Sequence, residues 1–393
     1  MKKLVKILGL ILIACKLIKA LSLVALDSVF YLYLYFKNRR KPKKGIALIK
    51  LDEIGDFFLW LGTAEKMRRE IPRSFVLIAN SLYASFAKTL PYWDEVISVD
   101  TKKLERSIPY RWQLFGIVAN YRFETIIQPT HVSSLLKGDS LVRMSLAKER
   151  IGSKGDISRW LFNVSKRISN RWYNKLIPFD LTIKHELHKN TAFISQFFCR
   201  KFENRAFCLE RSATYIHPLL DGLNYFLIFP GASANAEYKM WPKEKFAALG
   251  KRIMKERGLV AAVCGSKTER ELCEWIAKET GGINLSGETE IGEAVEIIRN
   301  SKFVVGNDSA SVHIAAAVKT PAFCIVGGGA FGAFIPYPEF WQEPPVPIYY
   351  NMPCYHCSWR CIYRLKSERI AFPCISNITV EMVFKKVNNS KII

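Results

Sequence analysis

Tyr225-Phe226-Leu227-Ile228-Phe229-Pro230-Gly231-Ala232-Ser233 is the stretch that decides the fold, and Lys239-Met240-Trp241-Pro242 follows it closely. The apolar run 225–229 predicts a buried strand, the small residues predict a loop, and the amphipathic run 245–256 predicts a helix. Such a loop lets backbone N–H groups approach an anion, while the next helix N-terminus and a lysine add positive charge. We therefore expect a diphosphate to be bound by Gly231, Ala232, Ser233 and Lys239.

Short apolar runs alternate with helical periods on both sides of this stretch. One series has predicted strands at 46–51, 75–79, 96–99 and 125–128, and the other at 225–229, 259–264, 283–285, 303–305 and 322–326. Such alternation is typical of βαβ units and parallel sheets. We predict an α/β protein with two Rossmann-like, doubly wound domains, 45–215 and 216–393, that face each other across a cleft. Residues 136–190 are basic, aromatic and less regular.

The composition excludes a disordered chain, because 49% of the 393 residues are hydrophobic. The formal net charge is +23, and residues 1–50 hold twelve Lys or Arg against the single acid Asp27. Clustered positive charge points to an anionic partner, which can be a membrane surface, nucleic acid or a phosphorylated substrate. Several cysteines stand singly inside apolar runs, which is typical of a reducing compartment.

Residues 1–44 predict a membrane-associated helix followed by a polybasic segment. The charges that interrupt the apolar stretch 4–36 fall within one arc of about 140° on a helical wheel. A basic amphipathic helix lies in the membrane interface, but 20–36 is also long enough for a single span. The basic run 37–44 suits anionic cytoplasmic headgroups. An export signal is a further alternative, although Lys6 interrupts its apolar core. Deleting 1–44 is expected to release the protein from membranes with its fold retained.

The first predicted strand ends in Leu51-Asp52-Glu53-Ile54-Gly55-Asp56, and a helix is predicted from Phe57. Three carboxylates argue against a dinucleotide site, whose fingerprint needs glycines at this turn. An acid at the carboxyl end of a strand can instead remove a proton. We expect Asp56 to be either a general base or the N-cap of the helix, and Asp52 and Glu53 to be solvated.

A second cluster, Gly306-Asn307-Asp308-Ser309-Ala310-Ser311-Val312-His313, lies between a predicted strand and an Ala-rich helix. Ser309 or Ser311 can cap that helix, and the N–H groups at its start can hold a phosphate. Asp308, beside those donors, is placed to bind sugar hydroxyls. His313 belongs either to the core or to the site.

Taken together, these segments resemble glycosyltransferase family 9, the bacterial heptosyltransferases that build lipopolysaccharide core, from about Gly45 to Val387. Asp56 stands in the position of the family's proposed catalytic base. Phe229–Ser233, with Lys239, Trp241 and Pro242, resembles its diphosphate-binding segment. Asn307-Asp308-Ser309 with His313 matches its donor-sugar segment, and Val263-Cys264-Gly265-Ser266 with Glu269 resembles the loop near the nucleotide base and ribose.

The resemblance implies a GT-B architecture and an inverting single displacement that needs no metal. Asp56 would deprotonate an acceptor hydroxyl, and Lys239 would stabilise the departing diphosphate. The donor would be a nucleotide sugar, ADP-heptose by family default, bound by Gly231, Ala232, Ser233, Glu269, Asp308, Ser309 and His313. The acceptor would be lipopolysaccharide core or another lipid-linked glycan at the cytoplasmic face of the bacterial inner membrane.

Four cysteines, Cys354, Cys357, Cys361 and Cys374, lie within 21 residues of sequence. This density suits a structural zinc or iron–sulfur site, free thiols packed in a loop, or disulfides. We expect no catalytic role for them, and no cofactor is expected for the reaction.

Two further functions stay open. One is a nucleic-acid-binding protein that uses the basic charge, and the other is a catalytically silent membrane scaffold. The sequence contains no recognised nucleic-acid motif, so we expect no nucleic-acid partner. Asp56, Lys239 and Asp308 argue against the silent scaffold.

Overall fold

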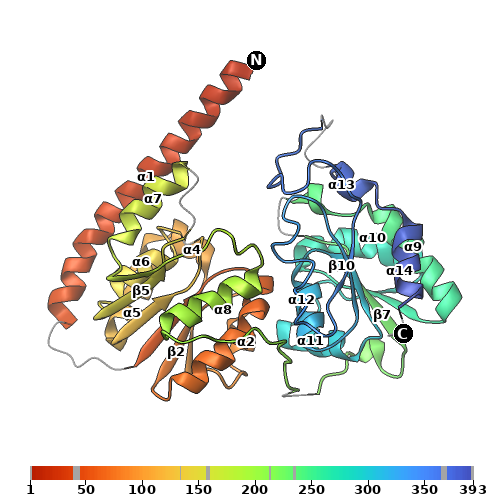
Figure 1. The fold of residues 1–393 in the computed structure, drawn as a ribbon, viewed down its shortest axis with the longest axis horizontal. Helices are drawn as coiled ribbons and strands as arrows, with labels where there is room; N and C mark the ends of the chain where they lie inside the picture. The colour runs from red at the N-terminus through yellow and green to blue at the C-terminus, as the bar shows by residue number, and fades with distance from the viewer. Residues whose placement is uncertain are drawn as a thin grey trace. The chain divides into compact units, whose positions relative to one another are not determined.

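The computed structural model describes residues 2–38, 45–132, 134–155, 160–211, 214–232, 236–363 and 370–390, and of residues 2–14, 16 and 160–163 only the backbone. Unit 1 comprises Met1–Glu53, Thr63–Thr182 and Ala192–Phe202, and unit 2 comprises Ile54–Gly62, Ile183–Thr191 and Glu203–Ile393. Each unit contains one parallel six-stranded sheet with helices on both faces (Figure 1). The predicted α/β class with two doubly wound sheets is confirmed, whereas the predicted domain boundaries and the cleft stay predictions.

The sheet of unit 1 has the strand order β3-β2-β1-β4-β5-β6. Its strands are β1 (Ile46–Lys50), β2 (Phe75–Asn80), β3 (Glu95–Val99), β4 (Thr125–Gln128), β5 (Glu149–Ser153) and β6 (Lys175–Ile177). Its helices are α3 (Ala84–Ala87), α4 (Thr101–Arg106), α5 (Ile108–Tyr121), α6 (Gly138–Met144) and α7 (Trp160–Asn170), while α2 (Ile54–Glu70) and α8 (Glu186–Phe197) are divided between the units. Segment 136–190, whose sequence pattern is less regular, contains α6, β5, α7, β6 and the start of α8.

The N-terminal helix α1 (Lys2–Asn38) is part of unit 1 and packs along α5 (Figure 1). Leu34 is 2% exposed and belongs to the same hydrophobic core as Ile49 and Phe115. Removing α1 would therefore uncover core side chains. The expectation that the fold survives deletion of 1–44 unchanged is not supported.

The sheet of unit 2 has the order β12-β11-β10-β7-β8-β9. Its strands are β7 (Tyr225–Phe229), β8 (Val260–Val263), β9 (Ile283–Asn284), β10 (Val304–Asn307), β11 (Ala322–Ile325) and β12 (Val346–Ile348). Its helices are α9 (Lys243–Arg257), α10 (Arg270–Thr280), α11 (Ile291–Asn300), α12 (Ala310–Ala317), α13 (Pro373–Ser376) and α14 (Val380–Asn388), with short 3₁₀ helices at Pro218–Leu220, Glu237–Lys239 and Lys267–Glu269. Stacked and edge-on rings of Phe226, Phe303 and Phe323 fill the core.

Both sheets follow the same winding. In chain order within each unit, the first strand lies between the second and the fourth, which is the order of dinucleotide-binding folds. The direction of winding reverses between β7 and β10 in unit 2, so the loops after these two strands diverge to opposite faces. Ligands of open α/β sheets bind at the carboxyl edge of such a reversal, and this edge carries the predicted site segments.

Candidate functional site

The loops after β7 and β10 are joined by a single buried amide. Asn307, 1% exposed, donates from Nδ2 to the carbonyl oxygens of Pro230 (2.7 Å) and Gly231 (3.2 Å). Its Oδ1 accepts from the backbone N–H of Trp241 at 3.0 Å. These bonds hold the loop after β7 and the backbone at Trp241 against the end of β10. Asn307 is thus a positioning residue. It belongs to the predicted motif 306–313, but its contacts could not be predicted from the sequence.

Gly231 lies against the carboxylate of Glu269. A Cβ at Gly231 would overlap Glu269 Oε1, so only glycine fits here without a shift. The Glu269 carboxylate is held by the backbone N–H and the hydroxyl of Ser266, both at 2.7 Å, in a capping box. The structure therefore brings Gly231 and Glu269 together, as their shared assignment to the donor site requires. Ala232 follows in the same loop, and Ser233 lies outside the described residues.

Asp308 and Lys239 form the charged centre of this edge. Burial raises the pKa of the Asp308 carboxyl to about 6, and the charge of Lys239 opposes that rise. Burial likewise lowers the pKa of the Lys239 ammonium, against the attraction of Asp308. Lys239 Nζ lies 4.7 Å from the ring centroid of Trp359, a cation–π contact that holds the side chain partly out of water.

His313 is buried in an aromatic cluster beside Asp308. Its Nδ1 is 2.9 Å from the Tyr337 hydroxyl, and its Nε2 is 3.9 Å from Asp308 Oδ1. Burial, with a smaller contribution from His185, lowers the pKa of His313 to about 3, so the imidazole is neutral at pH 7. His185 reaches the same cluster, with Nε2 2.7 Å from the Phe334 carbonyl oxygen. No local sequence pattern pointed to His185 or Tyr337, because they are 128 and 24 residues from His313.

The start of α12 offers backbone donors next to these side chains. Ser309 is the N-cap residue, but its side chain makes no capping hydrogen bond, and its Oγ instead lies 3.1 Å from Ser311 Oγ. An uncapped first turn leaves N–H groups directed at an incoming anion. Ser309 is confirmed at the helix start, while its expected capping bond is not formed.

The first turn of α2 lies against this helix start. A Cβ on Gly55 would come within 3.0 Å of His313 Cδ2 and 3.6 Å of Ala310 Cα. Residues 54–62 accordingly belong by their contacts to unit 2. Asp56, the next residue, is thereby placed in the first turn of a helix that abuts the donor-directed segment.

Two expectations at this turn are wrong. The N-cap of α2 is Glu53, with φ −74° and ψ 167°, so Asp56 is the third helical residue and not the cap. Asp52 was expected to be solvated but is bound within the protein. Lys50 Nζ lies 2.7 Å from its Oδ2, and the Thr130 hydroxyl donates to the same oxygen at 2.9 Å. Lys50 is only 3% exposed, and a buried charge requires a counter-ion, which Asp52 provides.

The cysteines after β12 are unpaired thiols. Cys354, Cys357 and Cys361 are partly exposed, and Cys374 is buried. Burial raises the pKa of Cys374, and charge on the other three would raise it further, so the four lie in one neighbourhood. Within the described part of the chain, no group of three or more His, Cys, Asp or Glu side chains is arranged to hold a metal ion. The structural metal stays a prediction, and no step below uses it.

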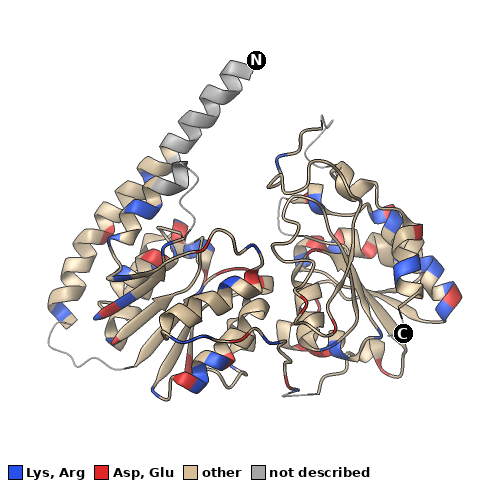
Figure 2. Ribbon diagram, in the orientation of Figure 1, with Lys and Arg blue, Asp and Glu red and all other residues tan. Residues whose placement is uncertain are grey.

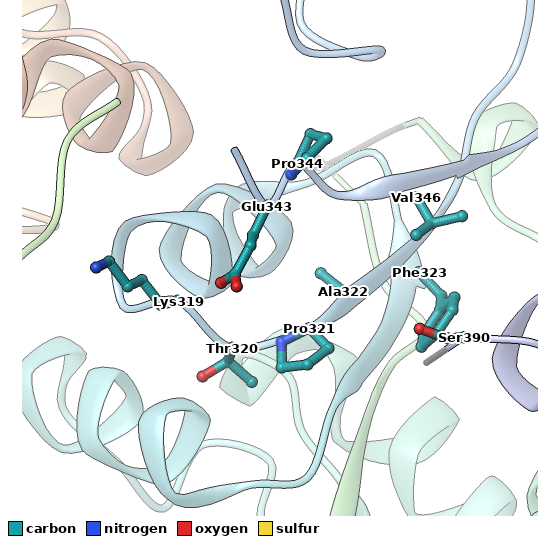
Figure 3. A pocket seen from close by; sticks show the side chains of 9 residues that line it. All are labelled: Lys319, Thr320, Pro321, Ala322, Phe323, Glu343, Pro344, Val346 and Ser390. Carbon is teal, nitrogen blue, oxygen red and sulfur yellow. The ribbon is translucent and has the colours of Figure 1, made fainter. Parts of the chain in front are cut away.

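A small pocket elsewhere in unit 2 carries no site chemistry. It lies at the amino end of β11, where Lys319, Pro321, Glu343 and Ser390 are among its lining residues (Figure 3). The predicted site residues lie at the carboxyl ends of β7 and β10, which is the opposite edge of the same parallel sheet. We therefore assign it no role in the reaction.

A model of glycosyltransferase family 9 (heptosyltransferase) matches residues 111–339, more than half of the chain. The chain belongs to this family. Among curated members, lipooligosaccharide heptosyltransferase 2 of Haemophilus ducreyi is 32% identical over 121 residues, which cover 29% of this chain and 32% of the relative. Lipopolysaccharide heptosyltransferase 3 of Escherichia coli is 31% identical over 141 residues, 34% of this chain and 39% of the relative. The chain thus spans about a third of the length of the curated relatives it matches.

Solved structures of the family share the fold. E. coli ADP-heptose lipopolysaccharide heptosyltransferase II superposes with a TM-score of 0.64 at 17% identity, covering 88% of this chain and 97% of that one. E. coli heptosyltransferase WaaC with ADP-2-deoxy-2-fluoro heptose gives a TM-score of 0.60 at 13% identity, covering 88% and 99%. At these identities the likeness establishes the GT-B type of fold and leaves the site residues to be argued from their own geometry.

Proposed function

We propose that this family 9 member is an inverting glycosyltransferase that moves a sugar from a nucleotide sugar to a lipid-linked or lipopolysaccharide-core acceptor. The donor is ADP-heptose by family default, and the reaction takes place at the cytoplasmic face of the bacterial inner membrane. The observation that carries the proposal is the placement of the Asp56 turn against Ala310 and His313, at the helix start beside Asp308 and Lys239. An acid and an anion-binding edge thus meet in one unit.

Asp56 acts as the general base. It removes the proton of an acceptor hydroxyl, whose oxygen then attacks the anomeric carbon of the donor and inverts its configuration. The bond from that carbon to the diphosphate oxygen breaks, and the electron pair leaves with the diphosphate. Asp56 lies in the first turn of α2, whose residues 54–62 pack with the donor-site segments of unit 2.

The anion-binding edge stabilises the leaving group. Lys239 supplies a full charge, and the first turn of α12 and the Gly231–Ala232 loop supply backbone N–H groups. These groups take the part that a divalent cation has in other transferases, so we propose a metal-independent reaction. Asp308 hydrogen-bonds donor-sugar hydroxyls, while neutral His313 and Glu269 border the donor.

Replacing Asp56 by Asn tests the base. We expect turnover from ADP-heptose to heptose-deficient lipopolysaccharide to fall roughly 10²–10⁴-fold, with ADP affinity by calorimetry little changed. Glu53→Gln is the matched control, because Glu53 is exposed, lies three residues away and makes no side-chain capping bond. Unchanged turnover in the Asp56 variant would refute the base, and lost ADP binding would make the residue structural. A wild-type protein that binds ADP but transfers no sugar would instead be the silent scaffold.

A further inference from the structure

Helix α1 is fastened to unit 1 through a buried ion pair. Asp27 Oδ2 accepts from Arg111 Nε at 2.7 Å and lies 2.6 Å from Arg111 Nη2, and the two residues are 2% and 1% exposed. Trp112 Nε1 donates to the other carboxylate oxygen at 3.3 Å, and the Trp112 ring stacks on Phe30 at 4.8 Å. The single acid of residues 1–50 thus faces the protein.

A second contact begins at the next residue of α1 and extends over the following turn. Arg143 donates to the Ser28 hydroxyl at 2.9 Å, and its guanidinium lies over the rings of Tyr31 (5.2 Å) and Trp172 (5.0 Å). Leu34 is buried in the core of unit 1. We call Asp27, Phe30, Tyr31 and Leu34 the inner face of α1. This face fixes the rotation of the helix about its axis as well as its position.

The opposite side of α1, its outer face, is exposed and apolar. It consists of Ile18, Leu21, Leu26, Val29, Leu32, Tyr33, Tyr35 and Phe36, each at least 37% exposed. Val29 and Phe36 are 68% and 61% exposed. From 21 to 36 the other exposed residues are Ala25 and Ser22, whose hydroxyl bonds back to the Ile18 carbonyl oxygen. A helix against water has the reverse pattern, with its charges outside.

The surroundings of the outer face suit anionic lipid. Lys19 and Lys37 are exposed at the two ends of this face, and the sequence continues with Arg39, Arg40, Lys41, Lys43 and Lys44, which lie outside the described residues. Tyr33 and Tyr35 have the amphipathic rings that gather at the headgroup level. In Figure 2 the described part of α1 is mostly tan, with its few charged residues at intervals.

We propose that the outer face of α1 lies in the interface of an anionic bilayer while the inner face stays bound to unit 1, so that α1 sets the orientation of unit 1 on the membrane. Leu17–Asn38 is long and apolar enough to span, with a mean hydropathy of 1.7. A span would surround these residues with lipid and require Asp27 to leave Arg111, placing a carboxylate near the bilayer centre. The interfacial position keeps the ion pair intact. The inference refines the membrane-surface location proposed above and does not depend on transferase activity.

The test uses the full chain and sedimentation with vesicles of phosphatidylcholine and phosphatidylglycerol at 7:3. We expect Val29→Glu with Leu32→Glu to weaken binding about tenfold or more, because both charges would enter the interface. Leu181→Glu is the matched control: Leu181 is 65% exposed in unit 1 and lies away from α1 in sequence. Wild type should bind vesicles of pure phosphatidylcholine about tenfold less well. The melting curve of the Val29→Glu, Leu32→Glu variant by circular dichroism and its affinity for ADP should match those of wild type. A loss of vesicle binding in this variant therefore does not depend on whether the transferase proposal holds.

Three results would overturn the inference. Unchanged vesicle binding in the Val29/Leu32 variant would exclude the outer face as the lipid contact. Resistance of the bound wild type to extraction by alkaline carbonate would favour a span over an interfacial helix. A change from dimer to monomer on gel filtration, without a change in lipid binding, would mean that the face is covered by a second copy.

Discussion

Burial of the Asp308 side chain disfavours its ionised form in the folded protein. Its pKa is raised to about 6 by burial, from 3.8 in the unfolded chain, and Lys239 only partly offsets the rise. Between these two values the folded state holds more protons than the unfolded state, so the group's contribution to stability is present below pH 4 and is lost as the pH rises through 6. A carboxylate kept here at a cost in stability is consistent with a role in binding.

Replacing Asp308 by Asn should therefore stabilise the protein at neutral pH. The variant should match wild type near pH 4 and exceed it by up to about 3 kcal/mol at pH 7, since each pKa unit corresponds to about 1.4 kcal/mol. Urea unfolding of both proteins across pH 4–8 measures the difference. A difference that does not grow with pH would show that the carboxyl is not buried as the structure has it. Donor-sugar binding should weaken in the same variant.

Lys239 is predicted to act on the diphosphate and not on stability. Lys239→Ala should weaken ADP binding about ten- to hundredfold, the effect of losing one charge-assisted contact, and should slow transfer. Lys243→Ala is the matched control, because Lys243 Nζ also lies over a tryptophan, 4.3 Å from the Trp275 centroid, whereas it is Lys239 whose charge acts on the pKa of Asp308. Calorimetry with ADP gives the result. Equal affinities for the two variants would exclude Lys239 from the phosphate site.

Single residues were predictable where their chemistry is local. Gly231 could be placed in a loop after a strand, and Asp308 and Ser309 at a helix start, from neighbouring residues alone. Asn307 could not be given its role, since its partners Pro230 and Trp241 are 77 and 66 residues away. The same holds for Tyr337, which positions His313 through a contact that only the fold creates.

At the scale of elements, the bounds of a strand were predictable from the sequence where the element is apolar and buried. They were not predictable where the element buries polar side chains. Strand Tyr225–Phe229 has the predicted bounds because five uninterrupted apolar residues mark it. In segment 136–190, β5 is Glu149-Arg150-Ile151-Gly152-Ser153, with one large apolar residue. Helix α6 buries Asp139, whose Oδ1 accepts a hydrogen bond from the Tyr173 hydroxyl at 2.5 Å. Such partners replace the apolar pattern and are invisible in one sequence.

The attachment of α1 to α5 gives a prediction about elements. Asp27→Leu leaves Arg111 buried without its counter-ion and should destabilise the protein by about 3–5 kcal/mol. The double variant Asp27→Leu with Arg111→Met removes both charges and should recover much of that loss, although the carbonyls of Leu104 and Leu136 lose a donor. Urea titrations of the single and double variants measure both steps.

The control for this prediction is an exposed pair. Arg73 and Glu124 lie 3.0 Å apart with side chains 66% and 44% exposed, so Glu124→Leu should change stability little. If Asp27→Leu changed the free energy of unfolding as little as Glu124→Leu does, the ion pair would not hold α1 in place. The orienting role proposed for the helix would then lose its basis.

At the scale of the whole molecule, the two sheets have the same strand order, but the segments attached to them differ. Every predicted donor-site residue within the described part of the chain lies in unit 2, and so does the predicted base Asp56, which belongs to this unit through the first half of α2. Unit 1 instead contains α1, for which we propose a position at the membrane surface. The sequence predicted two sheets because the strand pattern repeats, but it could not show that α2 is divided between the units, because contacts and not chain order decide that.

Donor choice is a property of the assembled protein and can be read from its melting temperature. A ligand at a hundred times its Kd stabilises the folded state by about 2.7 kcal/mol, which for a unit of this size raises Tm by roughly 5–10 °C. We expect ADP and ADP-sugars to give this shift, and UDP, GDP and dTDP at equal concentration to give much less. The Lys239→Ala variant should lose most of the ADP shift if the nucleotide binds where we propose. An equal or larger shift with UDP would retain a nucleotide-sugar transferase but reject ADP-heptose as its donor.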